Sequence, residues 1–124
     1  AVHALAYPLG GKYRVPHGLS NAMLLPTVMA FNLVGNEARF AAMARAMGLD
    51  VAGRTDAEAG RAFVDALRQL NADLGIPSDL KTVGVKPQDL DGLVDGAAKV
   101  TRLLDNNPRP MSRADMRAVY EQLI

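Results

Sequence analysis

The chain opens with AVHALAYPLGGKYRVPHGLSNAMLLP, residues 1–26, and this stretch holds both histidines of the 124-residue sequence. His3 lies in a segment of helical composition, and His17 precedes a long apolar run. A turn rich in proline and glycine separates the two. Histidine is the commonest metal ligand among the side chains, so the pair is a candidate metal site. The pair alone is a weak signal, because two polar residues that flank a loop give the same pattern.

The composition is that of an ordinary globular protein, with 49% hydrophobic residues and a net charge of +1. This length predicts one domain over residues 1–124. The near-zero net charge argues against a nucleic-acid partner. The apolar run over residues 19–34 is interrupted by Asn21, Pro26 and Asn32 and is too short to span a membrane. The lack of cysteine fits the reducing cytoplasm, which we expect as the location.

The first helix is expected to begin near His3 and to end at Tyr7, because a proline disfavours helical conformation in the residue before it. Gly10 and Gly11 would then form the turn. The absence of an initiator methionine and the abrupt apolar start favour a piece of a longer protein.

A second helix is predicted from about Gly18 to Val34, apolar nearly all round and therefore buried on most sides. Pro26 is expected to kink this helix or to open a turn in it. Gly35 provides the stop, and Asn36 is placed to cap a third helix that ends at Gly48.

The second half of the chain continues with helical patterns. Thr55 and Glu58 have the spacing of a capping box, and the helix that follows ends at Gly75. A turn-rich connection over residues 75–86 contains one possible helical turn at Ser78. Pro87 then suits the first position of a further helix.

That further helix is expected to keep its period to Leu104, and residues 106–110 end it. Ser112 is predicted to cap a last helix, with Met116, Val119, Tyr120 and Leu123 facing inward. No segment alternates as a strand does. The sequence therefore predicts an all-α helical bundle.

Residues 3–11, HALAYPLGG, and residues 15–26, VPHGLSNAMLLP, resemble the metal-binding signature of the iron-containing (group III) alcohol dehydrogenases. In that signature the second histidine opens His-Gly-x-x-Asn-Ala-x-x-Leu-Pro, which is matched by His17, Gly18, Asn21, Ala22, Leu25 and Pro26. Dehydroquinate synthases and glycerol dehydrogenases typically carry Gly-Glu after this histidine and so differ. The segments at 75–85 and 105–109 extend the resemblance along the whole length.

The resemblance implies that residues 1–124 form the C-terminal α-helical metal-binding domain, a helical bundle of the dehydroquinate synthase-like C-terminal type. His3 and His17 would hold Fe(II) or Zn(II), together with an Asp and a His from upstream of this chain. The N-terminal dinucleotide-binding domain, which would bind NAD or NADP, is absent from this chain. The parent enzyme is expected to act on a small alcohol or aldehyde and to form a homo-oligomer, whereas the piece alone is expected to be inactive.

Tyr7 departs from the family pattern, because several members carry a histidine at this position. It lies four residues after His3 and so would share its helix face. We expect Tyr7 either to line the catalytic pocket and pass a proton, or to serve only as a packing residue.

Two rival functions stay open. One is a maleylacetate or lactaldehyde-type reductase on the same scaffold. The other is a non-catalytic helical interaction module without a metal site.

Overall fold

The computed structural model describes the backbone of residues 1–124 and every side chain except those of residues 101 and 102. The described backbone is helical and contains no strand, which confirms the predicted all-α class. The elements in chain order are α1 (Val2–Tyr13), α2 (His17–Leu33), α3 (Glu37–Ala46), α4 (Asp56–Asp73), η1 (Lys81–Val83), η2 (Pro87–Asp89), α5 (Leu90–Ala98), α6 (Thr101–Leu104) and α7 (Arg113–Gln122).

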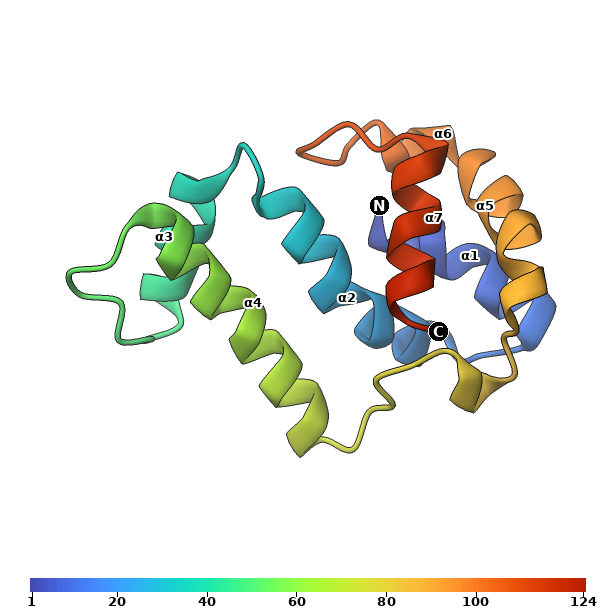
Figure 1. The fold of residues 1–124 in the computed structure, drawn as a ribbon, viewed down its shortest axis with the longest axis horizontal. Helices are drawn as coiled ribbons and strands as arrows, with labels where there is room; N and C mark the ends of the chain where they lie inside the picture. The colour runs from blue at the N-terminus through green and yellow to red at the C-terminus, as the bar shows by residue number, and fades with distance from the viewer.

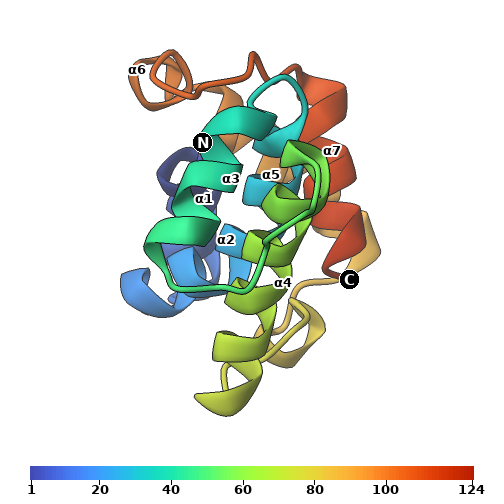
Figure 2. The same ribbon diagram turned by 90° about the vertical axis from the view of Figure 1, so that its left-hand side faces the viewer.

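Helix α2 lies in the centre of the bundle, between two groups of helices (Figure 1). On one side α1, α5 and α7 pack around the larger core, which includes Leu5, Leu24, Leu93 and Tyr120. On the other side α3 and α4 form a helical hairpin (Figure 2). This hairpin has a smaller core of its own, built around Phe40 and Phe63. Because α2 contributes side chains to both groups, its position fixes the two cores relative to each other.

The caps predicted for α4 and α7 are confirmed. Thr55 accepts a hydrogen bond from the backbone N–H of Glu58 at the start of α4, at 3.2 Å. At the start of α7, the hydroxyl of Ser112 accepts from the backbone N–H of Asp115, and the Asp115 carboxylate accepts from the backbone N–H of Ser112. Each cap satisfies amide groups that the first turn of a helix leaves free.

The predicted end of the first helix at Tyr7 is wrong. Helix α1 continues through Pro8, Gly10 and Gly11 as far as Tyr13. Proline removes one hydrogen bond from a helix interior, and glycine disfavours helix, but both effects are local. Leu5 and Leu9 are completely buried on the packed face of α1, so tertiary burial outweighs them. The chain turns instead at Arg14, which has a left-handed φ of 54°.

Helix α2 continues through Pro26, which excludes the turn but not the kink that were expected there as alternatives. Two boundaries differ from the expectation. The short helical turn expected at Ser78 occurs at Lys81–Val83. The helix predicted to reach Leu104 ends at Ala98, and a separate short helix, α6, follows and packs against α1. Helix α6 does not continue α5, because it packs against α1, and no local sequence pattern encodes that contact.

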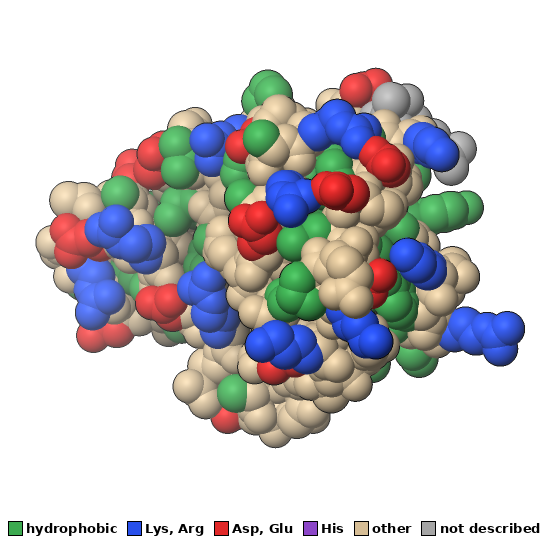
Figure 3. Space-filling view, turned by 45° about the vertical axis from the view of Figure 1, so that its right-hand side comes forward, with side chains coloured by type: hydrophobic (Ala, Val, Ile, Leu, Met, Phe, Trp, Pro, Cys, Tyr) green, Lys and Arg blue, Asp and Glu red, His purple; other side chains and the backbone are tan. Residues whose placement is uncertain are grey.

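Exposed ion pairs join α5 to α7. Arg113 pairs with Asp95, and Arg117 pairs with Asp91 and also with Glu121 within α7. The face that carries these helices shows basic and acidic side chains interspersed (Figure 3). Exposed pairs of this kind contribute little each, about 0–1 kcal/mol, so the apolar cores carry the stability.

Candidate metal centre

His3 and His17 come from two different helices and meet at their starts. His3 lies in the first turn of α1, and His17 is the first residue of α2, directly after the extended Pro16. Their ring centroids are 5.4 Å apart, with the planes at 49°. Both side chains are exposed. The structure therefore brings the two predicted residues together, across the turn at residues 14–16 and not across Gly10–Gly11.

This separation suits one shared ion. With metal–nitrogen bonds of about 2.0–2.1 Å in tetrahedral geometry, two imidazole centroids on the same ion lie roughly 5 Å apart. Two rings that merely stack commonly show the same distance, so the separation alone is not diagnostic. Among the side chains that the structure describes, no group of three or more His, Cys, Asp or Glu is placed to hold a metal. The two histidines can therefore be at most part of a ligand set.

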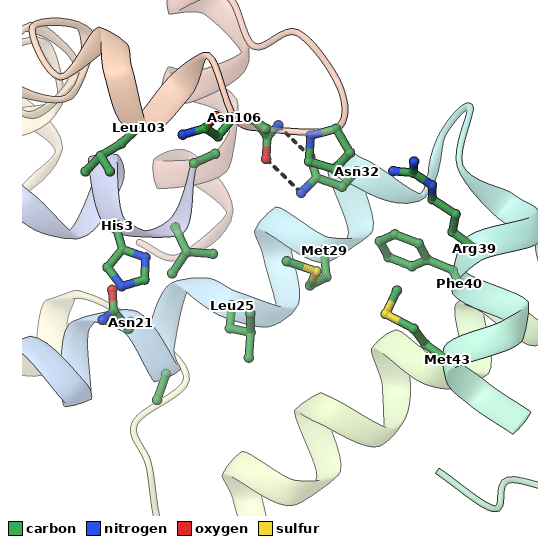
Figure 4. A pocket seen from close by; sticks show the side chains of 15 residues that line it. His3, Asn21, Leu25, Met29, Asn32, Arg39, Phe40, Met43, Leu103 and Asn106 are labelled. Atoms are coloured by element: carbon green, nitrogen blue, oxygen red, sulfur yellow. Dashed lines mark hydrogen bonds between the residues drawn. The ribbon is translucent and has the colours of Figure 1, made fainter. Parts of the chain in front are cut away.

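Asn21 supplies a second observation at this place. It lies four residues after His17, so it shares a face of α2 with that histidine. Its side-chain oxygen is buried and has no hydrogen-bond partner among the described residues. Figure 4 shows the Asn21 side chain directed toward His3, with the oxygen on the side of the imidazole ring. A buried acceptor without a partner destabilises a fold by about 1–3 kcal/mol and so calls for an explanation.

The chemistry of these groups fits a divalent transition metal. Neutral imidazole is a ligand for iron and zinc. A ligating histidine also donates its other ring N–H to a nearby acceptor, and a buried amide oxygen beside His3 is an acceptor of that kind. In the sequence, Asn21 stands out only as a match to the family motif. The signal that distinguishes it is its spacing of four from His17, which places both on one helix face.

A groove of about 750 Å³ begins at His3 and runs along α2 (Figure 4). Its walls come from α1, α2, α3 and the segment between α5 and α7. Most of the side chains are apolar, and the lining comprises Ala1, Val2, His3, Asn21, Ala22, Leu25, Met29, Asn32, Arg39, Phe40, Met43, Leu103, Asn106, Asn107 and Pro108. An apolar groove that ends at polar groups is suited to a ligand with a hydrocarbon part and a polar end.

A set of amide contacts closes the far end of this groove. The side chains of Asn32 and Asn107 donate to each other's oxygen atoms, at 3.0 and 2.7 Å. Arg109 donates to the backbone oxygen of Phe31 at 2.8 Å and lies over the Phe31 ring. Asn36 is the N-cap residue of α3, as predicted, but its side chain makes no capping bond and donates its amide to the backbone oxygen of Asn32. These contacts hold the Asn-Pro-Arg segment against the C-terminal end of α2.

Tyr7 lies one turn after His3 on α1, as its spacing predicts. Its side chain is 65% exposed, and Tyr7 is not among the described residues that line the groove. The structure therefore places Tyr7 beside the histidine pair, on the open surface of α1.

No helix within the part of the chain that the structure describes is long and apolar enough to cross a membrane. The profile of the Fe-containing alcohol dehydrogenase family, C-terminal, matches residues 1–124. The chain is similar to the 1,3-propanediol dehydrogenase of Klebsiella pneumoniae, with 37% identity over 98% of this chain and 31% of that protein. It is also 40% identical to the lactaldehyde reductase of Escherichia coli (strain K12), over 96% of this chain and 31% of the relative.

Among solved structures, a crystal structure of 1,3-propanediol oxidoreductase superposes with a TM-score of 0.94 at 36% identity, and covers 99% of this chain and 32% of that one. The chain thus spans about a third of the length of the relatives it matches. The match over the whole chain shows that this protein belongs to the Fe-containing alcohol dehydrogenase family, as part of its C-terminal domain.

Proposed function

We propose that the parent of this chain is a metal-dependent, NAD(P)-linked alcohol dehydrogenase, and that residues 1–124 are its C-terminal metal-binding domain. The observation that carries this proposal is the 5.4 Å separation of the His3 and His17 rings, at the positions where the family motif has its two histidines. Fe(II) is the expected ion, with Zn(II) as the alternative. When bound, the ion supplies Lewis-acid stabilisation of negative charge on the substrate oxygen.

The residues of this chain bind and orient the reactants. His3 and His17 present ring nitrogens from two helices, and the groove that begins at His3 offers an apolar surface to the hydrocarbon part of an alcohol or aldehyde. Tyr7, exposed beside His3, is proposed to hold or pass a proton at its phenolic oxygen. An Asp and a His from the preceding part of the parent would complete the ligand set, and a preceding dinucleotide-binding domain would hold NAD or NADP.

An activity assay of the full-length parent protein tests this proposal. The protein is stripped with a chelator, reconstituted with Fe(II) or Zn(II), and supplied with small primary alcohols or diols and either NAD or NADP. We expect metal-dependent formation of reduced nicotinamide, and loss of at least 100-fold in kcat/KM for His3→Ala and His17→Ala. Turnover that survives both substitutions would contradict the proposal. The 124-residue chain alone is expected to show no turnover.

A reductase of the lactaldehyde type is the second candidate, since the Escherichia coli lactaldehyde reductase is 40% identical over 119 residues. The same assay run in the direction of aldehyde reduction separates the two. A kcat/KM for lactaldehyde that exceeds those for unsubstituted aldehydes would favour this candidate.

Tyr7→Phe tests the proton role. A lowered kcat with an altered pH profile supports proton transfer by the phenol, whereas unchanged kinetics assign Tyr7 to packing.

A further inference from the structure

Asn21 is half-buried near His3, and its side-chain oxygen is buried without a hydrogen-bond partner among the described residues. Among the described side chains, the phenolic oxygen of Tyr13 is also buried without a hydrogen bond of good geometry, but it interacts with Asp89 and does not line the groove. The lone pairs of the Asn21 oxygen are therefore available to accept a hydrogen bond from a nearby N–H or O–H group.

His3 is the side chain that provides such a donor. Both Asn21 and His3 line the near end of the groove, and the Asn21 oxygen is directed at the His3 ring (Figure 4). A neutral imidazole has one N–H donor and one free lone pair, and which nitrogen carries the proton is set by the hydrogen bond that the ring makes. An amide oxygen can only accept, so it selects the tautomer that directs an N–H toward it.

We propose that Asn21 is a positioning residue for His3: a turn of the exposed His3 ring brings its N–H to the Asn21 oxygen, which accepts it and thereby keeps the other ring nitrogen free as a ligand. The proposal rests on the proposed function, because a fixed tautomer matters where the ring binds a metal. It assigns to Asn21 a role in ordering the site before the metal arrives. Partners of this kind generally affect metal affinity by about 10–100-fold when they are removed.

A matched control for Asn21 is found on α4, which also packs against α2. Asn71 of α4 donates its side-chain amide to the backbone oxygen of Ala22, at 2.8 Å, and does not line the groove. Asn71→Leu removes an amide of the same kind, and of the same size, without touching His3. Asn21→Leu removes the acceptor at nearly constant volume, whereas Asn21→Asp keeps an oxygen acceptor in place.

The first measurement is made on the full-length parent loaded with Zn(II), whose dissociation constant is determined by competition with a chelator. We expect Asn21→Leu to weaken Zn(II) binding about 10–100-fold, Asn21→Asp to stay within about 3-fold of the wild type, and Asn71→Leu to leave it unchanged. Equal affinity of Asn21→Leu and wild type would overturn the proposal. An equal loss in Asn21→Leu and Asn71→Leu would also overturn it, because the effect would then be general destabilisation.

The second measurement uses the metal-free wild-type parent, so it stands even if Asn21→Leu does not fold. Proton–nitrogen correlation spectra of the His3 ring report which nitrogen carries the proton in the neutral form. Free neutral histidine already favours the Nε2–H tautomer, so we expect a tautomer ratio for His3 that differs clearly from that of free histidine, and a ratio equal to it overturns the proposal. A clearly different ratio in a parent that binds no metal would leave the Asn21 contact intact and would contradict only the proposed function.

Discussion

The phenol of Tyr120 in α7 donates a hydrogen bond to the backbone oxygen of Leu5 in α1, at 2.6 Å, across 115 residues of sequence. Tyr120 is completely buried, and burial raises the pKa of its phenol, so the group remains a donor throughout the neutral range. The contact fastens the last helix of the chain to the helix that carries His3. The position of His3 in the candidate metal centre therefore depends on the packing of α7 against α1.

Removing this contact should loosen the bundle. Tyr120→Phe deletes the donor at nearly constant shape, and we expect the free energy of unfolding to fall by about 0.5–1.5 kcal/mol. Urea denaturation of the chain, followed by circular dichroism, measures the change. An unchanged midpoint would show that the hydrogen bond contributes nothing net to stability.

Two glycines of α5 should respond in opposite directions to alanine. A Cβ at Gly96 would lie 2.9 Å from the Cβ of Pro8, so Gly96→Ala forces α5 away from α1 and should destabilise by about 1–3 kcal/mol. A Cβ at Gly92 meets only the flexible end of Lys12, at 3.7 Å, and Gly92→Ala should stabilise by up to about 1 kcal/mol through helix propensity. Thermal unfolding of the two variants tests the close approach of α5 to α1 at Gly96 and Pro8. A Gly96→Ala variant that is more stable than the wild type would refute it.

The amide pair of Asn32 and Asn107 should behave as a unit. Asn32 is 1% exposed, so Asn107→Ala leaves a buried amide without its partner and should cost about 1–3 kcal/mol. Asn32→Ala should cost a similar amount, and the double variant should cost less than the sum. A double-mutant cycle on unfolding free energies measures this coupling, and strictly additive losses would mean that the two side chains do not depend on each other.

The cap of α7 predicts a pH dependence. The backbone N–H of Ser112 holds the pKa of Asp115 below its usual range, so the contact stabilises the fold while the carboxylate is ionised. The contribution is present above the unfolded-state pKa of about 3.9 and is lost as pH falls through the lower folded-state value. Asp115→Asn should therefore lower the free energy of unfolding at pH 7 by about 0.3–1 kcal/mol. The difference in stability between wild type and variant should shrink as the pH falls and the Asp115 carboxylate is protonated.

Melting temperatures between pH 7 and pH 3 test this dependence. Asp50→Asn is the control, because Asp50 is an exposed residue outside the helices. A difference between wild type and Asp115→Asn that persists unchanged at pH 3 would contradict the assignment.

The parts of the fold that follow from local sequence were predictable. The capping residues Thr55 and Ser112 bond within their own first turns, and glycines with positive φ end the segments at Gly35, Gly48 and Gly75. The continuation of α1 through Pro8 was not predictable, because it depends on burial against helices far away in sequence. The same holds for the end of α5 at Ala98, since α6 packs on α1.

The candidate site divides in the same way. His3 and His17 could be named from their motif, and the structure brings them together. Their approach follows from how α1 and α2 cross, which periodicity does not encode. The orphaned oxygen of Asn21 and the contact of Asn32 with Asn107, 75 residues away, arise only from tertiary packing. Their chemistry could not be derived from either residue alone.

Metal content of the full-length parent tests the central claim most directly. The protein is purified, reconstituted with Zn(II), freed of excess ion, and analysed by mass spectrometry for metal per chain, beside His3→Ala, His17→Ala and the control Tyr7→Phe. The account predicts close to one ion per chain for wild type and Tyr7→Phe, and a loss of most of the ion in each histidine variant. Wild-type metal content in both histidine variants would show that these residues are not the ligands.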